Sequence, residues 1–256
     1  MTQLKPFPIG DNSNLQQSPN IDSRISPWVA RMLYTLGCYV IIPLFFGKIE
    51  IRGQENIPQQ DSVIVAPTHR SRWDAFLVPY AVGRMVSGRD LRFMVSANEV
   101  KGIQGWFVRR MGGFPVDTER PKIDSIHHSI ELLQEDDEML VIFPEGGIYQ
   151  DNVIHPLKRG VALIALEVEA AKPDRNVKIL PVGVRYSQSF PSWGTNVKIN
   201  IGAPLKVADY LSNSLRKSSQ QLTSDLQTSL KKLYGNKVKM TITKKKSRAI
   251  VTKIFN

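Results

Sequence analysis

The sequence predicts an α/β fold in which a layered mixed sheet is flanked by helices, with an N-terminal membrane-associated helical segment. Three observations predict it. Short apolar, strand-like runs alternate along the chain with segments of helical spacing. An uncharged stretch of apolar and aromatic residues precedes the first of these runs. With 256 residues, 42% of them apolar, the chain has ample material for the core of one large domain or two small ones.

The N-terminal region divides into two parts. Residues 1–24 are polar and rich in Asn, Gln, Ser and Pro, so we expect them to be disordered, and no signal peptide is apparent. Residues 25–47 form the membrane-associated segment, which is about long enough to cross a bilayer, since a span takes roughly 20 residues. Arg31, Pro43 and the aromatic ends favour a monotopic, interfacial arrangement over a full span. A buried core helix is the alternative.

The strands and helices of the main domain follow in order. Residues 48–52 alternate like an early strand, and the apolar run 62–66 is typical of a buried one. The further expected strands are 91–95, 139–143, 177–184 and 197–201, and the expected helices are 123–133 and 161–171. A late amphipathic helix is marked by leucines on one face, namely Leu211, Leu215, Leu222, Leu226, Leu230 and Leu233. We expect one domain over 48–207, and the amphipathic helix with a basic tail over 208–256.

The positive charge is concentrated at the C-terminus. The formal net charge is +11, and nine of the 34 Lys and Arg residues follow position 230 with no acidic residue among them. The rest of the chain is therefore nearly neutral, with 25 Lys and Arg against 23 Asp and Glu. Such a tail suits an anionic membrane surface or nucleic acid, or is simply solvated. Because the tail lacks interleaved aromatic residues, we expect the membrane surface and no nucleic acid as its partner.

Cysteine content excludes two kinds of site. Cys38 is the only cysteine, so neither an intrachain disulfide nor a cysteine-based zinc site can form. This fits a reducing compartment. No feature demands a metal, a nucleotide or a redox cofactor, so we expect none.

His69 and Asp74 form the first candidate site. They follow the apolar run 62–66 at positions i and i+5. An imidazole can take a proton near neutral pH, and a nearby carboxylate can hold it in the required tautomer. No serine or cysteine nucleophile motif accompanies the pair, which points to a base that activates the hydroxyl of a substrate. The alternative is a capping box in which Ser71 begins a helix and Asp74 reaches back to it, and the two roles can coexist.

Other candidate residues lie in three polar segments. The run 143–147, Phe-Pro-Glu-Gly-Gly, follows a strand, and its Glu145 could position a polar group of the substrate or tie the loop together. The segment 112–120 ends in Arg120, which could grip a phosphate. Lys158 precedes a helix start that favours anions. Since His69 and Glu145 both follow strands, we expect them at one edge of the sheet.

Three blocks of residues carry a resemblance to a known family. They are His69-Arg70-Ser71-Arg72-Trp73-Asp74, Phe143-Pro144-Glu145-Gly146 and Ile179-Leu180-Pro181-Val182-Gly183. Their order and approximate spacing, from about Lys48 to Leu205, resemble the 1-acylglycerol-3-phosphate acyltransferase family. Gly112 to Arg120 and Pro156 to Gly160 resemble two further stretches of that family. The sequence departs from the pattern at Thr68, where asparagine is usual, and at Gly147-Ile148, where threonine and arginine are common.

The resemblance implies a function and a set of roles. The chain would be an O-acyltransferase that moves a fatty acyl group from acyl-CoA or an acyl carrier protein to 1-acyl-sn-glycerol 3-phosphate, giving phosphatidate. His69 would be the general base and Asp74 its orienter. The acceptor site would be shaped by Phe143, Pro144, Glu145 and Gly146, with Arg120 and Lys158 near the acceptor phosphate. The protein would be monotopic on a membrane and face the cytoplasm.

Three competing functions remain open at this point. A transacylase or remodelling enzyme would use the same pair with a phospholipid donor or another lipid alcohol. A basic nucleic-acid-binding protein and a non-catalytic lipid-binding relative are the other two, and the intact pair of His69 and Asp74 argues against the last.

Overall fold

The computed structural model describes residues 28, 32, 35–96, 102–110, 112–116, 123–135 and 138–235. The predicted disorder of residues 1–24 and the basic tail beyond residue 235 lie outside the described residues. So does Arg120.

Within the described residues, eight strands form one mixed sheet, which confirms the predicted fold class. The strands are β1 (Ile49–Arg52), β2 (Val63–Pro67), β3 (Leu91–Ser96), β4 (Gly113–Val116), β5 (Met139–Val141), β6 (Lys178–Tyr186), β7 (Val197–Ile201) and β8 (Leu205–Lys206). Their order is β1-β7-β6-β2-β5-β3-β4, and β8 pairs with β6. The pairs of β6 with β7 and β8 are antiparallel and the others are parallel. The carboxyl ends of β2, β5 and β6 therefore lie at one edge.

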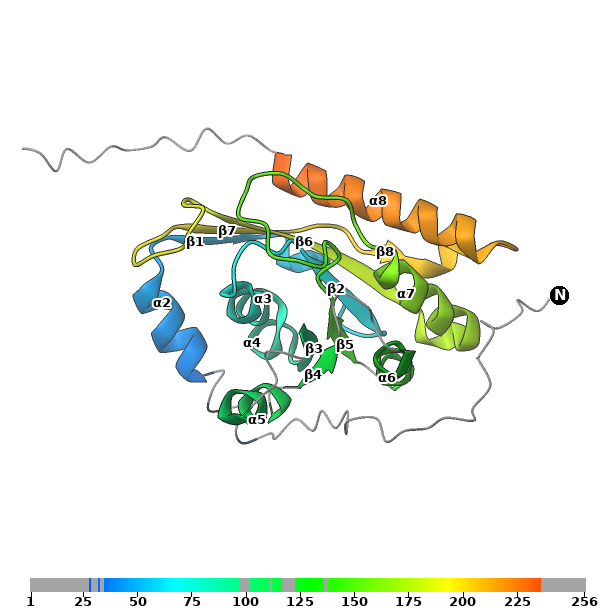
Figure 1. Ribbon diagram of the computed structural model, residues 1–256, viewed down its shortest axis with the longest axis horizontal. Coiled ribbons are helices and arrows are strands. Elements are labelled where there is room, and N and C mark those ends of the chain that lie inside the picture. The colour runs from blue at the N-terminus through cyan, green and yellow to red at the C-terminus, as the bar shows by residue number, and fades with distance from the viewer. Residues whose placement is uncertain are drawn as a thin grey trace, which may run out of the picture.

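Helices cover both faces of the sheet (Figure 1). They are η1 (Gly37–Ile41), α2 (Ile42–Phe45), η2 (Gln54–Asn56), α3 (Asp74–Val82), α4 (Arg84–Ser87), α5 (Gly102–Arg110), α6 (Ile123–Gln134), α7 (Gly160–Ala171), η4 (Pro173–Arg175), η5 (Val207–Tyr210) and α8 (Leu215–Gly235). Buried side chains of α6, α7 and α8 share one apolar cluster, and those of α2 and α3 share the other. The sheet is thus the middle layer of three.

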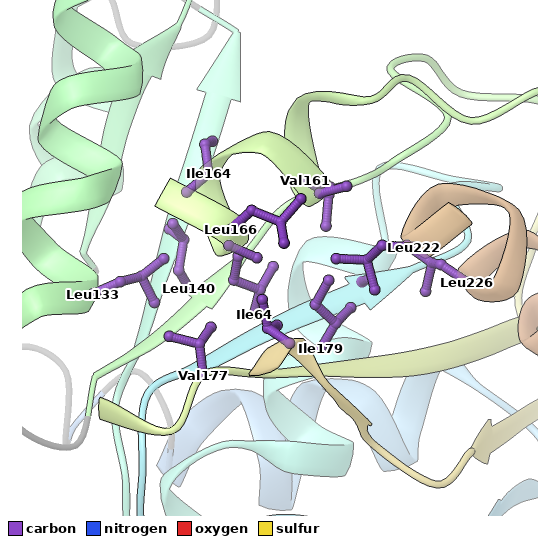
Figure 2. Packing of buried hydrophobic residues seen from close by; sticks show 14 of the residues in the cluster. Ile64, Leu133, Leu140, Val161, Ile164, Leu166, Val177, Ile179, Leu222 and Leu226 are labelled. Carbon is purple, nitrogen blue, oxygen red and sulfur yellow. The ribbon is translucent and has the colours of Figure 1, made fainter. Parts of the chain in front are cut away.

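Strand β2 shows why a wholly apolar run was needed at the centre. Ile64 and Ala66 point into the cluster under α7 and α8, part of which Figure 2 shows, whereas Val63 and Val65 point into the cluster under α3. Successive side chains of a strand alternate between faces, so a strand covered on both sides must be apolar throughout. Fully burying one such side chain contributes about 1.5–3 kcal/mol.

The structure corrects two predicted boundaries and adds a strand. β5 ends at Val141 and not at residue 143, because the carbonyl of Phe143 accepts the N–H of Gly146 in a tight turn. Leu211 lies before α8, where its N–H donates to Ala208 in the turn after η5, and the helix begins at Leu215. β4 was not predicted as a strand. Among the described strands it pairs with β3 alone, and at such an edge position Pro115 can lack an N–H donor.

Part of the predicted membrane-associated segment is described. Ile42 and Phe46 are 2% and 3% exposed and pack on the sheet, whereas Tyr39 and Leu44 are 64% and 61% exposed. Among the residues that the structure describes, no helix combines the length and apolarity that a membrane span requires. Membrane attachment of this segment stays a prediction.

Candidate active site

His69 and Asp74 meet at the carboxyl end of β2. His69 follows the strand by two residues, and Asp74 is the first residue of α3. The Nδ1 atom of His69 lies 3.0 Å from Oδ2 of Asp74. The Asp74 side chain is fully buried, while that of His69 keeps 17% of its surface exposed. The turn between strand and helix thus folds the carboxylate back under the ring and leaves the ring in reach of solvent.

Four donors surround the carboxylate of Asp74. Its Oδ2 accepts the N–H of Arg70 at 2.6 Å and that of Ser71 at 2.8 Å, in addition to Nδ1 of His69. Its Oδ1 accepts the hydroxyl of Tyr186, at the end of β6, at 2.6 Å. An ionised carboxylate can only accept hydrogen bonds, so the Nδ1 atom of His69 donates to Asp74 and carries the ring proton. Nε2 is then the basic nitrogen of the ring.

The capping interaction and the His69–Asp74 pair therefore coexist. The predicted helix start is corrected, because α3 begins at Asp74 and residues 71–73 form a turn before it. Ser71 Oγ accepts the N–H of Trp73 at 3.3 Å in this turn. Burial raises the pKa of Tyr186 far above its usual range, and the charge of Asp74 and the hydrogen bond to it add to the rise, so the phenol remains a donor.

Phe143 covers one face of the imidazole. The rings of His69 and Phe143 stack with centroids 3.8 Å apart and an interplanar angle of 18°. This contact and the bond to Asp74 restrict the ring in two independent ways. The structure thus brings Phe143 to His69, because these residues follow the neighbouring parallel strands β5 and β2.

Glu145 is held in a buried ion pair with Arg70. Its Oε1 accepts Nη1 of Arg70 at 2.9 Å, and its Oε2 accepts Nη2 at 3.2 Å. The same carboxylate accepts the N–H groups of His69 at 3.3 Å and His155 at 2.9 Å. The side chains of Glu145 and Arg70 are 0% and 4% exposed. Of its two predicted roles, tying the loop together is observed, and contact with a substrate stays a prediction.

Gly146 and Lys158 lie against each other beside this turn. Gly146 has a φ of +72°, which favours glycine, and a Cβ there would lie 2.5 Å from Cε of Lys158. Pro144 accepts the N–H of Lys158 at 2.8 Å, so the segment before α7 is fixed to the turn. The exposed Lys158 side chain therefore extends next to the Pro144–Gly146 turn, where an anionic substrate group could reach it.

Thr68 shows how the departure from the family pattern is accommodated. Its hydroxyl accepts the N–H of Val184 at 2.9 Å and donates to the carbonyl of the same residue at 3.2 Å. The side chain is fully buried, so it links the start of the His69 loop to β6.

Three residues that the sequence did not predict also belong to the site, namely Arg70, Tyr186 and Tyr234. The phenol oxygen of Tyr234, near the end of α8, accepts Nε of Arg70 at 3.1 Å. The guanidinium groups of Arg70 and Arg185 lie 5.0 and 4.8 Å from the centre of its ring. A polar cavity of about 70 Å³ opens beside these residues, and His69 does not line it. No sequence signal identified the two tyrosines as site residues. Arg70 could have been identified, because it is next to His69 in the chain.

Comparisons with known proteins identify a family for this chain. A family model described as "Acyltransferase" matches residues 48–185. The 1-acyl-sn-glycerol-3-phosphate acyltransferase of Streptococcus pneumoniae (strain ATCC BAA-255 / R6) is 30% identical over 191 residues, covering 70% of this chain. The chain spans 65% of the length of that relative. The enzyme of the same name from Bacillus subtilis (strain 168) is 29% identical over 198 residues, covering 73% of this chain and 88% of the relative.

A solved structure shares the fold. The crystal structure of the 1-acyl-sn-glycerophosphate (LPA) acyltransferase PlsC from Thermotoga maritima aligns with a TM-score of 0.60 at 20% identity. The alignment covers 82% of this chain and 81% of that one. At this identity the likeness shows the fold alone, a central sheet flanked by helices.

Proposed function

The chain belongs to the acyltransferase family, as its sequence predicted, and we propose that it acylates the free hydroxyl of 1-acyl-sn-glycerol 3-phosphate to give phosphatidate. The acyl donor is a thioester, either acyl-CoA or an acyl carrier protein. The observation that carries the proposal is the buried Asp74 carboxylate 3.0 Å from Nδ1 of a partly exposed His69. The names of the two bacterial relatives support the choice of acceptor.

In the proposed mechanism His69 acts as a general base. Nε2 takes the proton of the acceptor hydroxyl as the oxygen attacks the thioester carbonyl, and the thiolate leaves with the C–S bonding electrons. The proton then passes from Nε2 to that thiolate. Asp74 keeps Nδ1 protonated and offsets the positive charge that forms on the ring. General-base assistance of this kind typically contributes about 10²–10⁴-fold to the rate.

The acceptor site follows the turn after β5. Phe143, Pro144 and Gly146 shape it beside the His69 ring, and Glu145 holds the turn through Arg70. Lys158, next to Gly146, binds the acceptor phosphate together with Arg120. This mechanism requires no metal or redox cofactor, so activity should survive dialysis against EDTA. Because the acceptor is a membrane lipid, the proposed enzyme works at a membrane surface, and we propose a monotopic attachment that faces the cytoplasm.

Removal of the base tests the proposal. His69→Ala should lower kcat by about 10²-fold or more in an assay with acyl thioester and lysophosphatidate. His127→Ala, an exposed histidine on α6, is the matched control and should retain wild-type activity. A folded His69→Ala variant with normal turnover would exclude the mechanism.

A second experiment tests the acceptor. Lys158→Met should raise the KM for lysophosphatidate and leave that for the acyl thioester unchanged, because the ammonium group contacts the acceptor phosphate alone. Mass-spectrometric product detection with lysophosphatidate, glycerol phosphate and a monoacylglycerol compares acceptors directly. Equal turnover of the phosphate-free acceptor would contradict the assigned substrate, and transfer from a phospholipid with no thioester present would favour a transacylase.

A further inference from the structure

The turn that joins β6 to β7, residues 187–196, carries two of the most exposed aromatic side chains among the described residues. Phe190 is 70% exposed and Trp193 is 73% exposed. We call residues 187–196 the aromatic turn. It contains no Asp, Glu, Lys or Arg. Large aromatic side chains in such a position are unusual for a surface that faces water alone, and the proposed chemistry does not use them.

The aromatic turn is rigidly built. Ser192 N–H donates to Oγ1 of Thr195 at 2.8 Å, and Thr195 N–H donates to the carbonyl of Ser192 at 3.0 Å. Thr195 itself is fully buried. The side chain of Trp193 is thus displayed on a fixed backbone, so little conformational entropy is lost when it becomes buried against a partner.

The aromatic turn is joined to the end of α2. Gly194 N–H donates to the carbonyl of Phe45 at 2.8 Å, and Gly47 N–H donates to that of Thr195 at 3.0 Å. The ring of Trp193 meets that of Phe45 edge-on at 5.9 Å. In Figure 1 the turn accordingly lies beside α2 at one end of the sheet. On the helical segment that the turn contacts, Tyr39 of η1 and Leu44 of α2 are 64% and 61% exposed.

This surface continues to the His69 loop. Phe45 stacks on Trp73, which lies between His69 and Asp74 in the chain, with ring centroids 4.4 Å apart. Trp73 in turn contacts Phe76, which is 58% exposed on α3. An apolar phase that touched this surface would therefore lie next to the candidate site.

Charge and residue type indicate what covers the surface. Two exposed cations, Lys48 and Arg72, lie at its border. The backbone N–H of Lys48 donates to Oδ1 of Asn196, in the aromatic turn, at 2.7 Å. Exposed Trp and Phe beside cations match the boundary between the acyl chains and anionic headgroups of a bilayer. We infer that the aromatic turn inserts Phe190 and Trp193 into the surface of an anionic lipid bilayer. It forms a membrane contact beside α2. The contact also turns the candidate site toward the lipid acceptor, a step that rests on the proposed function.

Vesicle binding of the full chain tests the inference without any substrate. The partition coefficient onto vesicles of phosphatidylcholine and phosphatidylglycerol is measured by flotation. Replacing both residues, Phe190→Ser with Trp193→Ser, should lower it by about tenfold or more, since burying one aromatic side chain is itself worth about tenfold. Leu211→Ser alters a residue that is 38% exposed before α8 and is the matched control, which should bind normally. Circular dichroism and thermal unfolding verify that each variant is folded.

Fluorescence locates the turn directly. Phospholipids with bromine in the upper acyl chain quench buried tryptophan, and Trp193→Phe should remove part of the quenching seen with the wild type, which has four tryptophans. Unchanged partitioning of the double variant, or quenching that does not depend on Trp193, would overturn the inference. So would a wild-type dimer that becomes monomeric in the double variant while still binding vesicles. A wild type that binds through the turn but transfers no acyl group would refute the proposed function alone.

Discussion

The ion pair between Arg70 and Glu145 should contribute strongly to the free energy of unfolding, because both of its charges are buried. The guanidinium donates to both carboxylate oxygens, to the carbonyls of His69 and Val153, and to the hydroxyl of Tyr234. Arg70→Met removes all five bonds and leaves the charge of Glu145 buried with two backbone N–H donors. Breaking a buried pair in this way typically costs about 3–5 kcal/mol.

Chemical denaturation measures that cost. Because a domain of this size loses roughly 2–4 °C of Tm per kcal/mol, Arg70→Met should also lower Tm by about 6–20 °C. Arg70→Lys keeps the charge but loses the bidentate fork, so it should be less destabilising and remain folded if Arg70→Met does not. The kcat of Arg70→Lys should fall, because the ion pair joins the His69 loop to the Glu145 turn.

The chain provides a matched control for this pair. Arg84 also bonds both carboxylate oxygens of a partner, Asp90, but the Arg84 side chain is 41% exposed. Exposed pairs contribute about 0–1 kcal/mol, so Arg84→Met should have a small effect. The double variant Arg70→Met/Glu145→Leu should be no less stable than Arg70→Met, since it leaves no lone buried charge. Equal, small losses for Arg70→Met and Arg84→Met would refute the reasoning.

Three further predictions concern single contacts. Tyr186→Phe removes the donor to Oδ1 of Asp74 and should lower the free energy of unfolding by about 1.5–3 kcal/mol; an unchanged denaturation midpoint would argue against that bond. Gly146→Ala should lower the free energy of unfolding by about 1–2 kcal/mol, because residue 146 has a positive φ. The added methyl group should also displace Lys158 and raise the KM for lysophosphatidate, so wild-type stability and KM would contradict this packing. Burial raises the pKa of Glu169, so the folded state favours the protonated form and loses stability as pH rises through the carboxyl range. The free energy of unfolding of Glu169→Gln, measured by denaturation, should therefore rise relative to that of the wild type as the pH increases from about 4 to 8. A difference in free energy that does not change with pH would contradict the raised pKa of Glu169.

Local sequence signals were sufficient for most of the fold. The β7 strand was predicted with its observed bounds, and the helices α6 and α7 to within one residue, because their apolar periodicity is a property of neighbouring residues. The local signals failed for β4, whose Gly-Phe-Pro-Val run lacks a strand pattern and becomes a strand only by pairing with β3. They also placed the start of α3 too early, because Ser71 lies in the turn before the helix.

Residue order and type alone determined the family, the α/β class and the candidate pair of His69 and Asp74, which are separated by five positions in one turn. Tertiary structure decided which distant groups complete the site. Tyr186 reaches Asp74 across 112 positions, and Tyr234 reaches Arg70 across 164. Those contacts depend on the pairing of β2 with β6 and on the packing of α8, which are set by burial across the whole domain and leave no local trace in the sequence.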